Sequence, residues 1–171
     1  LIAVQGPESR VFLSELLGNH LNLNFYKHKN IMYENQNILL SRTGYTGELG
    51  YEILSNHKII LKFWKYLIEM GASPCGLAVR DILRMEMKYC LYGNDINENT
   101  SPLEAGLDWI VKFNNDFIGS DILLNQKQDG LKTKLIAFKM IDKCIPRKGY
   151  QIYYDNDEIG KVSSGTFSLG L

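Results

Sequence analysis

The stretch from Ser41 to Leu54, SRTGYTGELGYEIL, constrains the chain more than any other part of it. The apolar run Ile38-Leu39-Leu40 that leads into it is typical of a buried strand, and residues 51–54 resume a strand pattern. Glycine recurs at every third position between these two segments, at Gly44, Gly47 and Gly50. Because glycine lets the backbone turn tightly and adopt positive φ, the sequence predicts a strand, a glycine-rich loop and a second strand.

Aromatic and acidic side chains are spaced along this loop and the strand that leaves it, at Tyr45, Glu48, Tyr51 and Glu52. A carboxylate can accept two parallel N–H bonds from a flat, guanidine-like edge, and a tyrosine can cover a ring face. A pterin or a purine presents both features, whereas an ordinary hairpin with satisfied polar groups also fits the spacing. A triphosphate or dinucleotide loop is excluded, because no lysine-serine pair and no helix start follow the glycines.

Strand and helix patterns alternate through the first half of the chain. We expect a strand at 1–4, a helix at 8–17, a loose strand and turn within 19–37, and helices at 58–70 and 77–89. Aromatic and aliphatic residues recur at three- and four-residue steps in 58–70, which indicates a face packed in the core. This order predicts an α+β sandwich with a mostly antiparallel sheet.

The helix expected at 77–89 carries an unusual charge pattern. Glu86 lies in the middle of its apolar stripe, and a carboxylate there needs a hydrogen-bond donor. Arg80 and Arg84 share a neighbouring face, and Asp81 is spaced to pair with Arg84. The structural interpretation is a buried Glu86 beside two solvated arginines.

The last third of the chain changes its periodicity. A short helix is expected from Ser120 to about residue 126, followed by a polar linker at 126–134. Alternating patterns at 135–138, 150–154 and 159–163 predict strands, with a hairpin turn at Asp155-Asn156-Asp157.

Composition excludes several classes of protein. The 171 residues carry a formal net charge of +0, which argues against a nucleic-acid surface. No stretch approaches the roughly 20 apolar residues of a membrane span. The three cysteines and three histidines lack ligand-like or paired spacing, so we expect reduced thiols and no metal site.

Four stretches in order along the whole chain resemble the aminomethyltransferases, the T proteins of the glycine cleavage system. They are RTGYTGELGYE (42–52), GLAVRDILRMEMKYCLYGNDI (76–96), SPLEAGLDWIVKF (101–113) and KVSSGTFSLGL (161–171). The resemblance implies a folate-binding α/β sandwich domain over 1–128 and the start of a C-terminal β-barrel domain over 129–171. Because family members continue at both ends, we expect the chain to be an internal fragment.

The resemblance also implies an activity. The methylene of an aminomethyl group, held on the lipoyl arm of the carrier (H) protein, passes to tetrahydrofolate, and ammonia leaves. Tyr45, Glu52, Arg80 and Tyr89 match positions of the family's folate pocket: Glu52 would accept from the pterin amide and amino edge, and Tyr45 would pack on the ring system. Arg80 would either meet the ligand or orient a carboxylate. The family's catalytic aspartate lies upstream, so we expect no catalytic residue here.

Other readings remain open at this point. Folate-dependent demethylases, sarcosine-dehydrogenase-type folate domains and tRNA-modification proteins belong to the same superfamily, although the last group carries a cysteine in its loop where Thr43-Gly44-Tyr45 has none. A non-catalytic folate-binding module is a further alternative. The expected compartment is the cytoplasm for a bacterial source and the mitochondrial matrix for a eukaryotic one, with no membrane or nucleic-acid partner.

Overall fold

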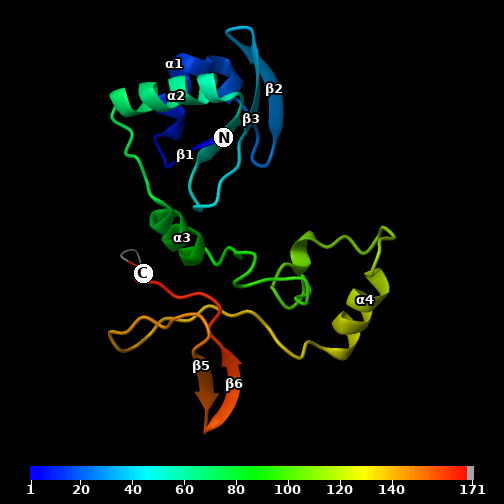
Figure 1. Ribbon diagram of the computed structural model, residues 1–171. Coiled ribbons are helices and arrows are strands. Elements are labelled where there is room, and N and C mark those ends of the chain that lie inside the picture. Colours follow the sequence, from blue (N-terminus) through cyan, green and yellow to red (C-terminus); the bar gives the residue numbers. More distant parts are fainter. Residues whose placement is uncertain (169–171) are drawn as a thin grey trace. The chain divides into compact units, whose positions relative to one another are not determined.

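A computed structural model of the chain describes residues 1–168, which fall into two compact units, Leu1–Met87 and the part from Lys88 onward. Each unit is described separately below. The first unit contains, in order, β1 (Ile2–Gln5), α1 (Ser9–Leu17), the 3-10 turn η1 (Gly18–Leu21), β2 (His28–Tyr33), β3 (Gln36–Ser41), β4 (Gly50–Leu54), α2 (His57–Glu69) and α3 (Leu77–Glu86) (Figure 1).

The four strands of the first unit form one antiparallel sheet in the order β1-β4-β3-β2. Ile53 of β4 lies opposite Ile2 of β1 and Leu40 of β3, and Tyr51 lies opposite Val4. Directly opposed residues share a sheet face, so these apolar side chains form one continuous layer. The predicted strand on each side of the glycine loop and the antiparallel sheet are confirmed.

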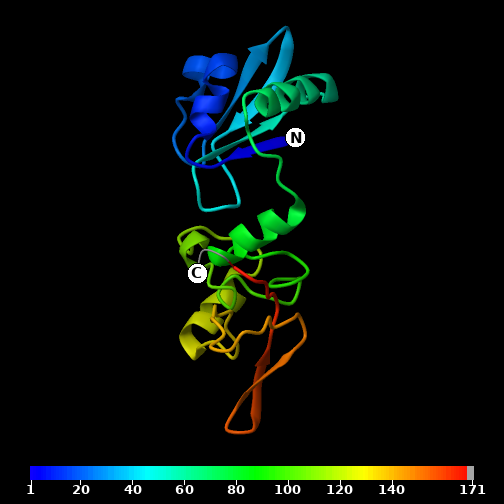
Figure 2. The same cartoon turned by 90° about the vertical axis from the view of Figure 1, so that its left-hand side faces the viewer.

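Both α1 and α2 pack on that apolar layer, on the same side of the sheet (Figures 1 and 2). In α2 the buried residues Ile59, Phe63 and Leu67 recur every four positions and so share one face. The core consists of Ile2, Val4, Leu13, Leu17, Leu21, Ile31, Ile38, Leu40, Tyr51, Ile53, Ile59, Phe63 and Leu67. Of the aromatic residues that the pattern assigned to this core, Trp64 is instead 45% exposed.

The segment predicted as a loose strand and turn is a regular hairpin of β2 and β3. Its turn residues Glu34 and Asn35 both have positive φ, 48° and 58°, which suits the twist of a two-residue hairpin loop. Phe25 and Tyr26 of the same segment lie before β2, and Tyr26 has a φ of 59°.

Helix α3 differs from its prediction in two respects. It ends at Glu86 rather than Tyr89, and Lys88 adopts a left-handed φ of 56°, which a continuing helix cannot contain. Arg84, expected in solvent, is 2% exposed, and its Nε donates to Asp81 Oδ1 at 2.7 Å. The predicted pair between Asp81 and Arg84 is therefore confirmed, but the prediction that Arg84 is solvated is wrong, whereas Arg80 is exposed.

The second unit contains the 3-10 turn η2 (Asp108–Ile110), α4 (Ser120–Asp129) and the hairpin of β5 (Gln151–Tyr154) and β6 (Asp157–Lys161). The predicted turn is confirmed, with positive φ at Asp155 and Asn156. Residues 135–138, expected as a strand, have no strand pairing within the described residues, and α4 ends at Asp129, three residues beyond its expected end. The division at 128/129 and the barrel domain stay predictions; residues 169–171 of the last motif lie outside the described residues.

None of the helices within residues 1–168 combines the length and the apolar character that a membrane-crossing segment requires. Cys75, Cys90 and Cys144 take part in no disulfide within the described residues.

The hydroxyl of Tyr51 provides a test of this core. It is fully buried, donates to the Leu21 carbonyl at 2.9 Å and accepts from Arg10 Nε at 3.1 Å. Tyr51→Phe removes one of two donors to the Leu21 carbonyl, which also accepts from the Leu23 amide at 2.9 Å, and it removes the acceptor of Arg10 Nε. We therefore expect the free energy of unfolding in urea to fall by about 0.5–1.5 kcal/mol. Tyr66→Phe is the matched control, because the Tyr66 hydroxyl bonds Glu15 at the surface. Equal stability of the two variants would contradict the assigned role of Tyr51.

Candidate functional site

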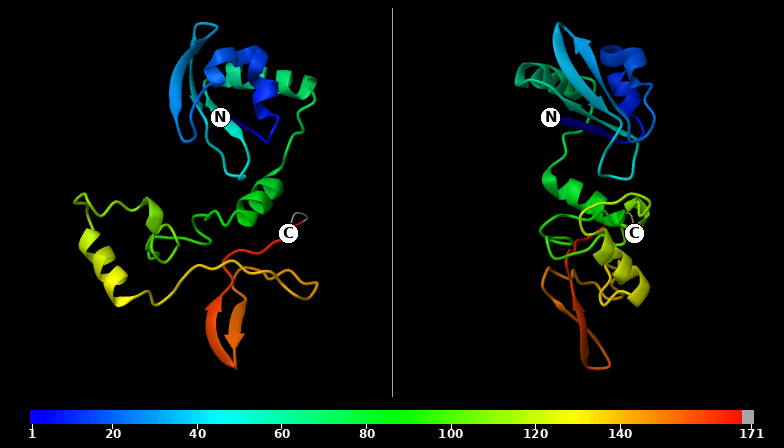
Figure 3. Two further views of the ribbon diagram at one scale, coloured as in Figure 1. Left: turned by 180° about the vertical axis from the view of Figure 1, so that it is seen from behind. Right: turned by 90° about the vertical axis from the view of Figure 1, so that its right-hand side faces the viewer.

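The glycine-rich loop, residues 42–49, connects β3 to β4 and projects from the end of the sheet opposite to the β2–β3 turn (Figure 3). Apolar residues on either side of it fix both strands in the core, so the loop starts and ends at rigid positions. A site built on such a loop is held by the sheet even though the loop itself lacks regular structure.

A single side chain from β1 holds the loop closed. The carboxamide of Gln5 donates through Nε2 to the carbonyl oxygens of Thr43, at 3.2 Å, and of Tyr51, at 3.3 Å. Its Oε1 accepts from the Thr46 hydroxyl at 3.3 Å. Gln5, which lies about 40 positions earlier in the chain, is therefore bonded to the start and the middle of the loop and to Tyr51 in the strand that follows it. Sequence reasoning did not identify Gln5.

The glycines have different functions from the predicted one. Only Gly47 of the three has positive φ, at 80°. At Gly44 and Gly50 an added Cβ would lie 2.0 and 2.1 Å from Gln5 Oε1, which is closer than any real Cβ contact. These two glycines are needed because the Gln5 carboxamide occupies the space of their side chains.

Glu52 lies between the buried residues Tyr51 and Ile53 of β4 and so points to the opposite sheet face from the core. It is partly buried, and its Oε2 accepts a hydrogen bond from the Thr43 hydroxyl. Its Oε1 has no hydrogen-bond partner within residues 1–168. Glu52 thus presents a free carboxylate oxygen beside the loop, whereas the Tyr51 side chain is buried in the core.

Helix α3 contacts the same loop. The guanidinium of Arg80 lies over the Tyr45 ring, 4.7 Å from its centroid, in cation–π geometry. Directly after the helix, the Met87 side chain packs closely on Gly47. A Cβ added at Gly47 would lie 2.6 Å from the Met87 sulfur. Three of the four predicted pocket residues, Tyr45, Glu52 and Arg80, therefore belong to the first unit, on the loop, its exit strand and the helix that contacts it.

The fourth predicted residue, Tyr89, follows α3 and belongs to the second unit, where it is partly buried. Its placement in the pocket stays a prediction. Within the first unit the structure separates the two arginines clearly, because Arg80 is exposed on the Tyr45 ring while Arg84 is buried and paired with Asp81.

A hollow of about 200 Å³ adjoins the base of the loop, lined by Phe25, Arg42, Thr43, Gly47, Glu48, Leu49 and Gly50. Arg42 Nη1 donates to the Leu23 carbonyl at 2.8 Å. Its Nε is buried and has no hydrogen-bond partner within the described residues. Arg42, which sequence reasoning did not identify, therefore lines the hollow while its Nε donor is enclosed in the protein.

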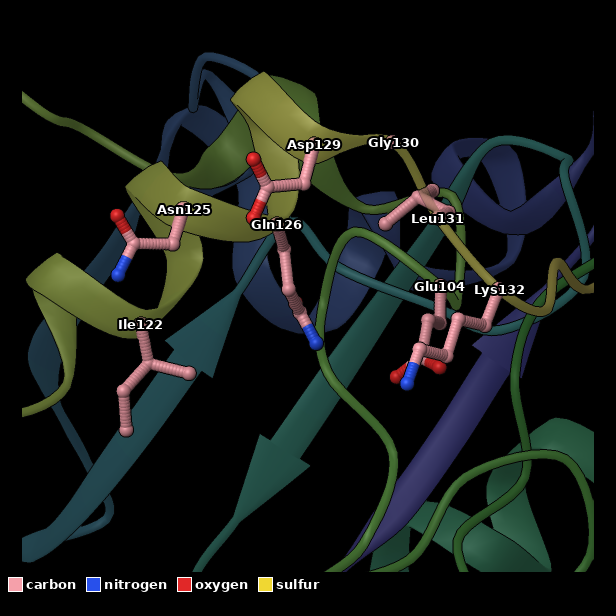
Figure 4. Close-up of a pocket in the computed structure, with 8 residues that line it drawn as sticks. All are labelled: Glu104, Ile122, Asn125, Gln126, Asp129, Gly130, Leu131 and Lys132. Atoms are coloured by element: carbon pink, nitrogen blue, oxygen red, sulfur yellow. The ribbon is translucent and has the colours of Figure 1, made fainter.

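A larger hollow, of about 350 Å³, lies in the second unit between one face of α4 and the segment that follows it (Figure 4). Its main charged group is Glu104, which accepts from the Ser101 amide at 3.0 Å and the Thr133 hydroxyl at 2.7 Å. These bonds, led by that from Thr133, lower the pKa of Glu104. Both carboxylate oxygens are already engaged, and no predicted site residue lines this hollow.

The geometry at the glycine loop suits a flat, uncharged or weakly charged heterocycle with N–H groups along one edge. Glu52 can accept from such an edge, and Tyr45 offers an aromatic face with a cation on it. No group of three or more metal-ligating side chains occurs within residues 1–168.

The family model described as the GCVT N-terminal domain matches residues 1–115. Proteins named aminomethyltransferase from Halothermothrix orenii and Prochlorococcus marinus (strain NATL1A) are 47% and 45% identical to this chain over its whole length. The chain spans about half the length of these curated relatives, 50% and 48% respectively.

Among solved structures, the crystal structure of glycine cleavage system aminomethyltransferase T from Bartonella henselae matches with a TM-score of 0.88 at 30% sequence identity. The match covers 96% of this chain and 46% of that chain.

Gly50→Ala tests the close packing of Gln5 against the loop. The new Cβ overlaps the Gln5 carboxamide, so we expect the free energy of unfolding to fall by about 1–3 kcal/mol. The matched control is the same substitution in a Gln5→Ala background, where the space is vacant and the cost should be much smaller. An equal cost in both backgrounds, measured by urea unfolding, would show that Gln5 is not what excludes a side chain at Gly50.

Proposed function

The chain belongs to the GCVT N-terminal domain family, and from this premise we propose that it supplies most of a folate pocket in an aminomethyltransferase. The reaction proposed for the whole protein moves a methylene from an aminomethyl group on a lipoyl arm to tetrahydrofolate. The carbon's bonds to sulfur and nitrogen break, new bonds to folate nitrogens form, and ammonia leaves. The names of the relatives and the geometry of the glycine loop support this assignment.

The observation that carries the proposal is the carboxylate of Glu52. It stands on the strand leaving the loop, partly buried, with Oε2 bonded to Thr43 and Oε1 without a partner within residues 1–168. A pterin presents an amide N–H and an amino group along one edge, and these donors match such an oxygen. Charge-assisted bonds of this kind are roughly twice as strong as neutral ones.

The remaining predicted residues would orient the ligand. Tyr45 would pack on the ring system, and Arg80, which lies over the Tyr45 ring, would stiffen that aromatic wall or meet the ligand itself. Orientation matters because a transfer between two bound groups depends on aligning the reacting atoms. The role of Tyr89 in the same pocket is part of the proposal.

The proposed partner is a carrier protein that bears the aminomethylated lipoyl arm, the H protein of the glycine cleavage system. This follows from the aminomethyltransferase names of the relatives, several of which come from bacteria. A bacterial cytoplasmic setting is proposed on the same basis. The group that manages protons in the reaction is proposed to lie in the half of the relatives that this chain does not span.

Glu52→Gln tests the pterin contact. The substitution keeps the size of the side chain but removes its charge and turns one acceptor oxygen into a donor facing donors. We expect tetrahydrofolate binding to weaken by about 2–3 kcal/mol, measured by calorimetry on the longest form of the protein that its gene encodes. Glu48→Gln, which changes an exposed carboxylate of the same loop, is the control. Unchanged affinity in Glu52→Gln would refute the assignment.

The two arginines of α3 give a second test. Arg80→Lys keeps the charge but loses the planar group that lies on Tyr45, so turnover should fall while the melting temperature stays nearly constant. Arg84→Lys should instead lower the melting temperature, because Arg84 is buried and bonded to Asp81. The reverse pattern would mean that Arg84 rather than Arg80 serves the pocket.

A further inference from the structure

The side chain of Gln5 occupies an unusual position for a residue on an edge strand. It lies against two glycines, and its carboxamide makes three hydrogen bonds, to Thr43, Thr46 and Tyr51. Both polar atoms of the amide are used in the orientation that the bonds require: Nε2 faces two carbonyl oxygens and Oε1 faces a hydroxyl. Gln5 therefore determines the spacing between the beginning and the end of the loop.

One of the groups held by Gln5 leads directly to the proposed ligand contact. The carbonyl of Thr43 is fixed by Gln5 Nε2, and the hydroxyl of the same residue donates to Glu52 Oε2. Glu52 follows Tyr51, whose carbonyl is the second acceptor of Gln5. The carboxylate is thus restrained from both ends of the loop.

Thr43 limits how Glu52 can meet a ligand. A carboxylate that is free to rotate can offer both oxygens to two parallel donors. Here one oxygen is occupied by the Thr43 hydroxyl, and the other, Oε1, has no partner within residues 1–168. The plane of the carboxylate and the oxygen that faces outward are then set before any ligand binds.

We propose that Gln5 and Thr43 are positioning residues for folate recognition: together they fix Glu52 so that Oε1 meets the N–H edge of the pterin. This inference rests on the proposed function. It assigns Gln5 and Thr43 no contact with the ligand, and it makes their effect on folate binding depend on the carboxylate of Glu52.

The decisive experiment is a double-substitution cycle with tetrahydrofolate as the probe, in the longest form of the protein that its gene encodes. Thr43→Val keeps the shape and removes the hydroxyl, so the dissociation constant should rise by about five- to tenfold. Thr43→Ser, which restores a hydroxyl, should recover most of the affinity. In a Glu52→Gln background Thr43→Val should have little further effect, because the group through which it acts is already altered.

The outcomes separate the two ideas. If Glu52→Gln weakens binding but Thr43→Val does not, or if Thr43→Val weakens it equally in both backgrounds, the positioning role is wrong and the folate assignment stands. If neither tetrahydrofolate binding nor a Glu52 effect is found, the proposed function fails and the inference fails with it. Melting temperatures of all variants distinguish a loss of positioning from a loss of fold.

Gln5→Glu extends the test to the other positioning residue. It keeps the length of the side chain but replaces the donor NH2 group with an oxygen that faces two carbonyl oxygens. Tetrahydrofolate affinity should fall at least as much as in Thr43→Val, and this loss should also shrink in the Glu52→Gln background. Gln128→Glu, an exposed position on α4, controls for the added charge. A loss that persists unchanged without the Glu52 carboxylate would overturn the role of Gln5.

Discussion

The geometry of the first unit depends on one carboxamide packed against two glycines. Gln5 takes the space beside Gly44 and Gly50, bonds the start and the middle of the loop, and bonds Tyr51 in β4. The Ser9 hydroxyl and the Gly6 amide both donate to the Leu49 carbonyl at the end of the loop. In this arrangement the hydroxyl of Thr43 donates to Glu52, and α3 contacts the loop at Tyr45.

The two faces of the sheet carry different kinds of side chain. Tyr51 and Ile53 point into the core formed with α1 and α2, and Glu52 between them points to the other face. This alternation explains why the polar Glu52 can stand between two buried residues of one strand: its side chain lies on the face away from the core. Helix α3 shows a similar division: Arg84 is buried and paired with Asp81, whereas Arg80 is exposed.

Much of this arrangement could be predicted from the sequence because it follows from local patterns. The strands around the glycine loop, the helices at α1 and α2, and the Asp81–Arg84 pair all follow from periodicity or short spacing. Gln5 could not be found that way, since its partners lie about 40 residues away and two of its three bonds are to backbone carbonyls. Periodicity also placed Arg80 and Arg84 on one polar face, although Arg84 is buried in the folded protein. Residues 135–138 alternate like a strand but have no strand partner within the described residues.

The one-sided core has an evolutionary consequence. Positions 3, 39, 52 and 54 lie on the sheet face away from the helices, so mutations there leave the packed layer of Ile2, Leu40 and Ile53 intact. Substitutions on the face that carries Glu52 and substitutions in the packed layer therefore affect different residues of the same strands. A lineage could change many residues of the outer face at nearly constant stability, whereas a side chain added at Gly44 or Gly50 requires the Gln5 carboxamide to move. Gln5, Gly44 and Gly50 should therefore covary among descendants more than positions 3, 39, 52 and 54.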